Sequence, residues 1–277
     1  MSTLAIPRAF VWRRLHSLMG LWLVLFLMEH LLANSQAALW LGDHGQGFVN
    51  MVNGIHNLPY LQVIEVTLLG IPILIHGILG MKYLLTSKLN FHRTDGSAPA
   101  IRTGRNLAYS WQRITSWVLL IGLILHVVNF RFLHYPDQVQ VDNQDGYTTV
   151  ISNDDGLESL ACRLNVILYD QDDLPPYLGT HYRLESNEKV ALTKDFGTAS
   201  LLGVRNEFKN PIYASLYTLF VLAACFHAFN GFWTFLITWG WILKASAQRA
   251  WISVAMLLML GIVFLGLSAI WGSYWIK

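Results

Sequence analysis

Four of the ten histidines in the sequence lie deep within long apolar runs: His30, His76, His126 and His227. Each occupies a different run, and an ionisable side chain surrounded by hydrocarbon is unfavourable enough that it is usually functional. No group of carboxylates or cysteines accompanies them in the sequence, which argues against a zinc or di-iron site. Neutral imidazole in an apolar bundle suits axial ligation of haem iron, so pairs of these histidines are expected to clamp haem groups. For any single one of them, a hydrogen-bonded core histidine is the alternative.

The apolar runs that carry these histidines are long enough to cross a membrane. Of the 277 residues, 54% are hydrophobic and 13% are charged, and the mean hydropathy is +0.41, whereas a soluble domain is usually about a quarter charged. Runs of roughly 18 or more apolar residues indicate spanning helices, which we place at 12–35, 59–86, 109–134, 210–243 and 250–275. The expected fold is an all-α membrane protein with five transmembrane helices, the first four forming a haem-binding bundle. The net charge of +2 is too small to indicate nucleic-acid binding.

Cationic residues predict how these helices cross the membrane, because cytoplasmic loops are enriched in Lys and Arg. Arg8, Arg13 and Arg14 precede the first span, and several more cations lie in the 87–108 connection, whereas the 36–58 connection has no Lys or Arg. We therefore expect a multi-pass protein of the cytoplasmic membrane, with its N-terminus in the cytoplasm and its C-terminus outside.

The depth of the four histidines then sorts them into pairs. With a rise of about 1.5 Å per residue, His30 and His126 lie roughly 20–25 Å outward from the cationic starts of their helices. His76 and His227 lie about as far inward from the outer ends of helices that run the other way. The predicted pairs are His30 with His126 for an outer haem, and His76 with His227 for an inner haem.

Small residues support this interpretation. Gly80, Gly122 and Gly231 each stand four residues from a deep histidine, on the same helical face. A missing side chain one turn away gives a flat macrocycle room against the backbone. Close packing of helices through small residues is the alternative.

Several polar side chains could complete the site. Arg14, Arg113 and Arg131 lie at helix ends, where guanidinium groups can pair with haem propionates or act as ordinary interface anchors. Glu65 stands eleven residues before the histidine of the second span, on nearly the same face of a regular helix. It could transfer protons at a quinone site near the outer haem, or it could simply face water at the helix end. His16 could contact a propionate or a cytoplasmic partner, or be solvated at the interface.

The connection at 135–208 is expected on the outer side and is too long for a bare loop in a compact protein. It begins just before Asp137 and holds thirteen of the seventeen carboxylates in the sequence. Segments 147–151 and 189–192 have strand-like composition. We expect 1–277 to form a single integral-membrane domain, with 135–208 inserted as an acidic loop or a small, partly β cap; a disordered insert is the alternative.

Five segments carry a resemblance to a known family: RRLHSLMG (13–20), EHL (29–31), PILIHG (72–77), WQRIT (111–115) and FHAFNGFW (226–233). They resemble the five-helix, di-haem cytochrome b subunit that anchors succinate:quinone oxidoreductase (complex II) and fumarate reductase. The resemblance covers all five spans and implies two haem b groups with the four deep histidines as axial ligands. It also implies a flavoprotein and an iron–sulfur subunit docked on the cytoplasmic side, and a quinone substrate, for which menaquinone is the first expectation. The long 135–208 insert departs from the family pattern.

The chain has no flavin fingerprint and no iron–sulfur cysteine set, so dicarboxylate chemistry is expected on the partner subunits. The predicted function is an electron relay from a partner iron–sulfur centre, through the inner and outer haems, to a membrane quinone. Two alternatives stay open at this point. One is a cytochrome b anchor of another quinone-linked dehydrogenase, and the other is a haem-free, proton-coupled transporter.

Overall fold

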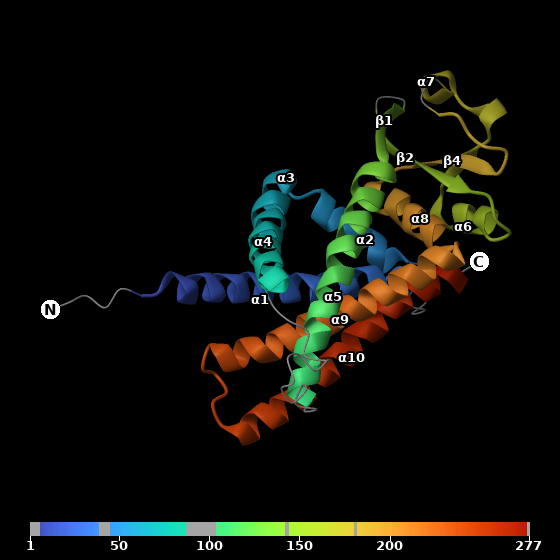
Figure 1. Ribbon diagram of the computed structural model, residues 1–277. Helices are drawn as coiled ribbons and strands as arrows, with labels where there is room; N and C mark the ends of the chain where they lie inside the picture. Colours follow the sequence, from blue (N-terminus) through green and yellow to red (C-terminus); the bar gives the residue numbers. More distant parts are fainter. Residues whose placement is uncertain (1–5, 39–44, 87–103, 142–143, 180–181, 276–277) are drawn as a thin grey trace. The chain divides into compact units, whose positions relative to one another are not determined.

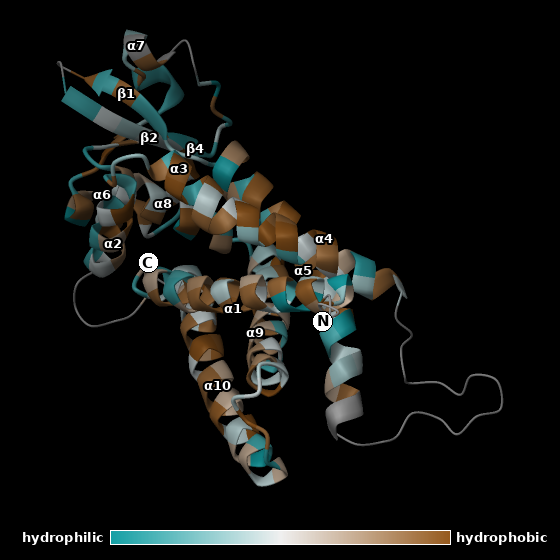
Figure 2. Ribbon diagram, turned by 90° about the vertical axis from the view of Figure 1, so that its left-hand side faces the viewer, coloured by the Kyte–Doolittle hydropathy of each residue, from teal (hydrophilic) through white to brown (hydrophobic). Residues whose placement is uncertain are grey.

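The computed structural model of the chain describes residues 6–38, 45–86, 104–141, 144–179 and 182–275. Five helices or helix runs are long and apolar enough to cross a membrane: Arg8–Ser35, Leu61–Thr86, Leu107–Leu133, Pro211–Thr238 and Ala245–Trp275. They confirm the five expected spans and the all-α membrane fold. Figure 2 shows hydrophobic residues along these helices and hydrophilic residues on the strands. Lys88, Arg93 and Arg102, which contribute to the predicted orientation, lie outside the described residues.

The individual helices follow from familiar start and stop signals. Helix α1 is Arg8–Ser35, α9 is Pro211–Thr238 and α10 is Ala245–Trp275. Asn210 caps α9, because its side-chain oxygen accepts the N–H of Ile212 at 2.9 Å. The fourth span was expected to reach residue 243, but α9 ends at Thr238. Gly240 adopts a φ of +79°, and the N–H of Trp241 bonds back to the carbonyl of Leu236 at 2.9 Å, which is the hydrogen-bond pattern of a Schellman cap.

Two of the spans contain π-turns that regular helical periodicity does not predict. The second span consists of α3 (Leu61–Ile64), the π-helix η1 (Glu65–Gly70) and α4 (Ile71–Thr86). The third consists of α5 (Gly104–Val127) and the π-helix η2 (Val128–Leu133). In η1 the indole N–H of Trp22 donates to the carbonyl of Leu68 at 2.5 Å. Single π-turns within helices occur frequently at functional sites.

The chain divides into two compact units, which are described separately. The first unit comprises Met1–His30, Gln62–Gly122 and Leu219–Phe264, and the second comprises Leu31–Leu61, Leu123–Thr218 and Leu265–Lys277. The first unit holds the greater part of α1, α5 and α10, all of α4, and the His227 half of α9.

The second unit contains a small sheet built by the long insert (Figure 1). Its strands are β1 (Asp137–Val141), β2 (Gln144–Ser152), β3 (Ile167–Tyr169) and β4 (Glu188–Thr193), in the order β1-β2-β4-β3 with all pairs antiparallel. The two segments expected as strands lie in β2 and β4, where Thr149 pairs with Ala191. Helices α6 (Leu157–Leu164) and α8 (Phe196–Phe208) accompany the sheet. Their shared core contains Ile151, Leu157, Leu160, Ala191 and Leu202.

Helix α2 (Gln46–His56) was not predicted, because the 36–58 connection was treated as a plain loop. It packs against α8 through the buried Phe48 and Val49, which share a cluster with Leu201. A Cβ atom at Gly197 would lie 2.6 Å from the carbonyl oxygen of Val49, so the two helices approach at that glycine. The apolar positions of α2 follow a helical spacing, which was the available signal.

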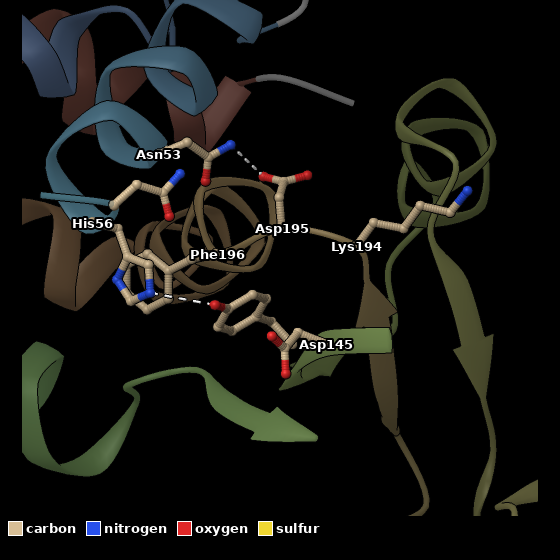
Figure 3. Close-up of a pocket in the computed structure, with 8 residues that line it drawn as sticks. Asn53, His56, Asp145, Lys194, Asp195 and Phe196 are labelled. Carbon is tan, nitrogen blue, oxygen red and sulfur yellow. Dashed lines mark hydrogen bonds between the residues drawn. The ribbon is translucent and has the colours of Figure 1, made fainter. Parts of the chain in front are cut away.

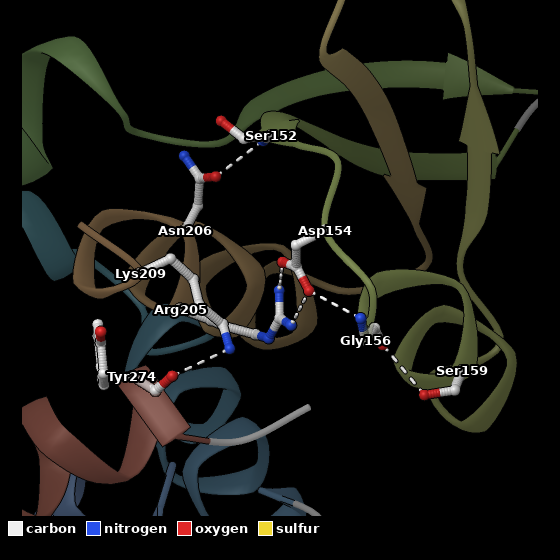
Figure 4. A network of polar contacts seen from close by, with 8 residues as sticks. All are labelled: Ser152, Asp154, Gly156, Ser159, Arg205, Asn206, Lys209 and Tyr274. Carbon is white, nitrogen blue, oxygen red and sulfur yellow. Dashed lines mark hydrogen bonds and ion pairs between the residues drawn. The ribbon is translucent and has the colours of Figure 1, made fainter. Parts of the chain in front are cut away.

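A buried ion pair holds α8 against the loop that follows β2. The Arg205 guanidinium donates to both carboxylate oxygens of Asp154 at 2.7 Å, and the Arg205 side chain is only 6% exposed. The N–H of Gly156 donates to the same carboxylate at 2.9 Å. Burial opposes ionisation of Asp154, but these donors outweigh it and hold the pKa of Asp154 below its usual range. Lys209, four residues further along, donates to the carbonyl of Tyr274 at 3.1 Å, which ties the same region to the end of α10 (Figure 4).

Candidate functional site

The first unit brings two of the deep histidines together. His76 of α4 and His227 of α9 have ring centres 6.3 Å apart, with their planes at 81°. A metal–imidazole bond is about 2 Å long, so two rings on opposite sides of one iron have centres roughly 6 Å apart. The separation therefore fits a pair of axial ligands from facing helices.

The hydrogen bond of His76 selects which ring nitrogen would meet a metal. Its Nδ1 lies 3.0 Å from the main-chain carbonyl oxygen of His16 on α1. A carbonyl oxygen can only accept, so Nδ1 carries the proton and Nε2 has the free lone pair. Histidine ligands of metals usually donate their other ring N–H in this way, which orients the ring and increases its basicity.

His227 shows the same arrangement on the opposite helix. Its Nδ1 lies 3.4 Å from the hydroxyl of Thr115 and 3.5 Å from that of Ser116, both on α5. Each hydroxyl already donates to a main-chain carbonyl in its own helix, Ser116 to Gln112 at 2.7 Å and Thr115 to Trp111 at 2.8 Å. Both are therefore acceptors for an Nδ1–H of His227, and Nε2 is again left as the metal-binding nitrogen.

His16 belongs to this site more closely than its sequence position suggested. Its ring stacks on that of His76 with centres 4.1 Å apart and planes 14° apart, and it meets Tyr83 edge-on at 5.3 Å. Its Nε2 is buried, and within the described part of the chain it has no hydrogen-bond partner. A Cβ atom at Gly80 would lie 3.3 Å from that nitrogen. Gly80 therefore makes room for His16.

The glycines around the site differ from the sequence expectation. Gly20, which was not singled out, lies directly against the ligand pair: a Cβ atom there would be 2.8 Å from Cε1 of His76. At Gly122 an added Cβ atom would instead collide with the ring of Phe220, and at Gly231 it would lie 3.8 Å from Nε2 of Gln112. A glycine on a neighbouring helix cannot be found from its spacing to a histidine on another helix.

A cavity of about 350 Å³ is lined by residues of α5 and α9, among them Gln112 and Asn230. Gln112 links the two helices there, because its amide nitrogen donates to the carbonyl of His227 at 3.1 Å and its amide oxygen accepts from Asn230 at 2.7 Å. Arg113 also lines this cavity. Its guanidinium lies 3.3 Å from the ring centre of Tyr109 and donates to the carbonyl of that residue at 3.0 Å. A single cation in a largely apolar cavity suits an anionic or carbonyl-bearing group.

The other two arginines have partners within the protein. Arg14 donates to the carbonyl of Thr238 at the C-terminus of α9 and lies 5.1 Å from the ring centre of Trp239. A cation at that position is favoured by the helix dipole. Arg131, in the second unit, lies 4.4 Å from the ring centre of Tyr135. The positions of these arginines do not test whether they contact a haem, so their assignment to haem propionates stays a prediction.

The other two deep histidines fall in different units. His30 of the first unit stacks on Phe26, with ring centres 5.4 Å apart. His126 of the second unit contacts Phe130 at 5.3 Å and Tyr217 at 5.9 Å. Their pairing across one haem therefore stays a prediction.

Glu65 is the first residue of η1 and is partly buried. The expectation that it shares a face with His76 assumed a regular α-helix between them. A π-turn in that stretch holds one extra residue, which rotates later positions by about 100° relative to earlier ones. The role of Glu65 at a quinone site is untested. The π-turn weakens the argument that Glu65 and His76 lie on the same helical face.

The second unit has a polar pocket of about 230 Å³ where the end of α2 meets the start of α8 (Figure 3). The ring of His56 stacks on that of Phe196 at 3.9 Å, and its Nε2 lies 3.4 Å from the hydroxyl of Tyr147. Asn53 donates to Asp195 at 2.7 Å, and Asp195 caps α8 through the N–H of Thr198. These contacts join α2, β2 and α8, which is a structural role.

Within the described ranges, no three His, Cys, Asp or Glu side chains are grouped so that they could hold a bare metal ion. The paired histidines suit a metal that brings its own equatorial ligands, as the iron of a porphyrin does.

The fold and these sites define an integral membrane protein with five helical spans and with histidines paired between spans. Over 264 residues the chain is 24% identical to the succinate dehydrogenase cytochrome b558 subunit of Bacillus subtilis (strain 168), in an alignment that covers 95% of this chain and 96% of that protein. No protein-family model matches the chain, and no solved structure matches it.

Proposed function

We propose that this chain is the di-haem cytochrome b subunit that anchors a succinate dehydrogenase to the membrane. It would relay electrons from a partner iron–sulfur subunit, through two b haems, to a membrane quinone. The similarity to a succinate dehydrogenase cytochrome b subunit runs almost from end to end, and the five spans account for the anchoring.

The observation that carries the haem proposal is the pair of oriented imidazoles in the first unit. His76 and His227 face each other from different helices at 6.3 Å, and each directs its Nδ1–H to an acceptor in the protein. These residues would hold the inner haem through their Nε2 atoms. When bound, the haem supplies one-electron redox chemistry. The residues of this chain orient the ligands, surround them with apolar side chains and exclude water.

His30 and His126 would hold the outer haem in the same way. Two protein ligands for each iron would leave no site for oxygen, so electron transfer is the chemistry that a haem held by these residues would supply. Arg113 is the first candidate for an inner propionate contact, because it lines the same cavity as Gln112, which is bonded to the carbonyl of His227. Arg14 and Arg131 are the further candidates.

The proposed partners are a flavoprotein subunit, where succinate is oxidised, and an iron–sulfur subunit, both on the cytoplasmic side. The distribution of cationic residues favours the same orientation in the cytoplasmic membrane, with the N-terminus in the cytoplasm and the C-terminus outside. The electron acceptor would be a quinone, with menaquinone as the first choice. Glu65 is proposed as a proton-transfer residue at its site.

Single-histidine variants of the purified complex test the assignment. His76→Ala and His227→Ala should each remove the same component from the dithionite-reduced minus oxidised spectrum, and His30→Ala and His126→Ala should each remove the other. His56→Ala is the matched control, because His56 lies on α2 outside the spans, and both components should persist. If His30→Ala and His76→Ala removed the same component, the pairing would be wrong. A wild-type complex without any b-type spectrum would exclude the proposal and favour a haem-free transporter.

A further inference from the structure

A ring of three polar side chains lies in the second unit, around a buried carboxylate. Glu207 of α8 is only 9% exposed. Its carboxylate accepts from the amide nitrogen of Asn129 at 2.9 Å and lies 3.5 Å from Nε2 of His134. The third side of the ring joins Nδ1 of His134 to the amide oxygen of Asn129 at 3.0 Å. Glu207 was assigned no role from the sequence, where it is one of many carboxylates in the insert.

The donors and acceptors of this ring determine where its protons lie. The amide nitrogen of Asn129 faces a carboxylate, which only accepts, so the amide oxygen of Asn129 must take the Nδ1–H of His134. With Nδ1–H committed to Asn129, Nε2 is the ring nitrogen of His134 that faces the carboxylate of Glu207, 3.5 Å away. A proton bound to either group therefore lies where the other group can take it.

The two ends of this pair differ in their access to water. The side chain of His134 is 40% exposed, whereas that of Glu207 is 9% exposed. A partly exposed imidazole whose Nε2 faces a buried carboxylate can move protons between water and the interior. The exposed His134 and the buried Glu207 are therefore arranged as a path that protons can enter from the aqueous phase.

The π-turn η2 places this ring close to a predicted haem ligand. The N–H of His134 bonds to the carbonyl of Asn129, five residues earlier, at 2.9 Å, so the π-turn sets both side chains toward α8. Residue 128, the start of η2, comes two positions after His126. Aromatic contacts run from His126 to Tyr217 at 5.9 Å and from Tyr217 to Phe208 at 5.2 Å. Phe208 follows Glu207 in the chain.

The charged groups near Glu207 have other partners. On α8 itself, Arg205 is paired with Asp154, and Lys209, just beyond the helix, donates to the carbonyl of Tyr274. On η2, Arg131 lies over the ring of Tyr135. Asn129 is neutral. Tyr217 of α9 packs against Phe208, is hydrogen-bonded to Asn129 and interacts electrostatically with Glu207. Among these groups, His134 is the one within ion-pairing distance of Glu207.

We propose that the pair of Glu207 and His134 passes protons between the aqueous phase and a quinone that reacts beside the haem held by His126. This inference rests on the proposed function. Reduction of one quinone to a quinol consumes two electrons, which succinate oxidation on the partner subunits supplies, and two protons, which form the two O–H bonds. For each proton, Nε2 of His134 takes it from water and passes it to the Glu207 carboxylate 3.5 Å away, while Nδ1 keeps its own proton on Asn129. Glu207 then releases the proton towards the quinone oxygen. Quinol oxidation uses the same path in reverse.

The test uses the complete purified complex. In Glu207→Gln the amide oxygen can still accept from Asn129, so the ring keeps its shape, but the side chain no longer exchanges a proton. Quinone-coupled succinate oxidation should fall by about tenfold or more. Succinate oxidation with a water-soluble acceptor and the reduced-minus-oxidised haem spectrum should stay unchanged. Glu207→Asp should recover part of the turnover. Glu158→Gln is the matched control, because Glu158 is a 70% exposed carboxylate of the same insert, and its turnover should be that of wild type.

A second readout separates proton transfer from a structural role. Quinone-coupled turnover of Glu207→Gln should show a larger solvent deuterium isotope effect than wild type, because proton delivery becomes limiting. His134→Gly should lose quinone-coupled turnover and regain it when imidazole is added. This rescue also tests proton transfer by the pair if the Glu207→Gln complex does not assemble. Normal quinone turnover in Glu207→Gln with both haems present would overturn the inference. A loss without an isotope effect, together with a failure of imidazole to rescue His134→Gly, would overturn it as well. Absence of haem from the wild-type complex would instead overturn the proposed function.

Discussion

The Nδ1–H of His76 is donated to the main-chain carbonyl of His16, across 3.0 Å between α4 and α1. Because the acceptor is main chain, no side-chain substitution at position 16 removes it. The orientation of this ligand therefore depends on how closely the two helices approach, and Gly20 is the residue at that approach.

Gly20→Ala should eject the inner haem. The added methyl would lie 2.8 Å from Cε1 and 3.0 Å from Nδ1 of His76, so the ring must turn and leave its acceptor. Haem quantification should show one haem per chain instead of two, with the His30/His126 component retained. Gly261→Ala is the control, since no atom of the described part of the chain lies within 4 Å of a Cβ atom there. Full haem content in Gly20→Ala would mean that α1 can move away from α4 while His76 still binds the haem iron.

Removal of the acceptors on His227 should weaken the same haem. In a Thr115→Val, Ser116→Ala double variant, the Nδ1–H of His227 loses both hydroxyls. Loss of such outer-shell partners usually reduces metal-site affinity or activity by about 10- to 100-fold. Haem retention during detergent dialysis should fall, and the inner midpoint potential should shift. Ser215→Ala is the control, because the hydroxyl of Ser215 donates to the carbonyl of Pro211 in its own helix at 2.7 Å; haem retention and the inner midpoint potential should be those of wild type. Unchanged retention in the double variant would assign the tautomer of His227 to another contact.

Hydropathy predicted the five spans, because the length and composition of a span are local properties of the sequence. The depth of His76 and His227 placed them at one level, but the haem that they would share stays a prediction. Gly20 and Thr115 could not be found in that way, since their roles arise from contacts between helices. The π-turn at Glu65 was also unpredictable, because a single extra residue leaves no mark on an apolar pattern. Glu207 shows a further limit. It stands among many carboxylates of an acidic insert, and only the fold shows that this one is buried against His134.

Glu65→Gln tests the sequence-based assignment of a quinone-site proton donor. We expect both haems to remain and succinate oxidation with a soluble acceptor to stay near normal. Quinone-coupled turnover should fall by about 100-fold or more, because the variant removes the titrating group and keeps its shape. Glu29→Gln is the control, because Glu29 is an exposed carboxylate in another span, and this variant should have little effect. Normal quinone turnover in Glu65→Gln would assign that residue to the solvated end of its helix.

The ion pair between Asp154 and Arg205 should control the stability of the insert. Asp154→Asn leaves the buried guanidinium without its charge partner, which should reduce the stability of α8 by roughly 2 to 3 kcal/mol, as Asp154 is partly exposed. Hydrogen exchange of α8 amides in the purified complex measures this change. Because the pKa of Asp154 is lowered on folding, its stabilisation is present above the ordinary Asp pKa of about 3.9 and is lost as the pH falls through the folded value. Glu158→Gln should change exchange little; equal effects in the two variants would contradict this account.

The central claim is that this chain binds two haem b groups between its spans. A pyridine haemochrome assay on the purified complex, with the protein quantified by amino-acid analysis, measures this ratio directly. The account predicts two haem b per chain, both low-spin and six-coordinate in the optical spectrum. One haem per chain, or none, would contradict it.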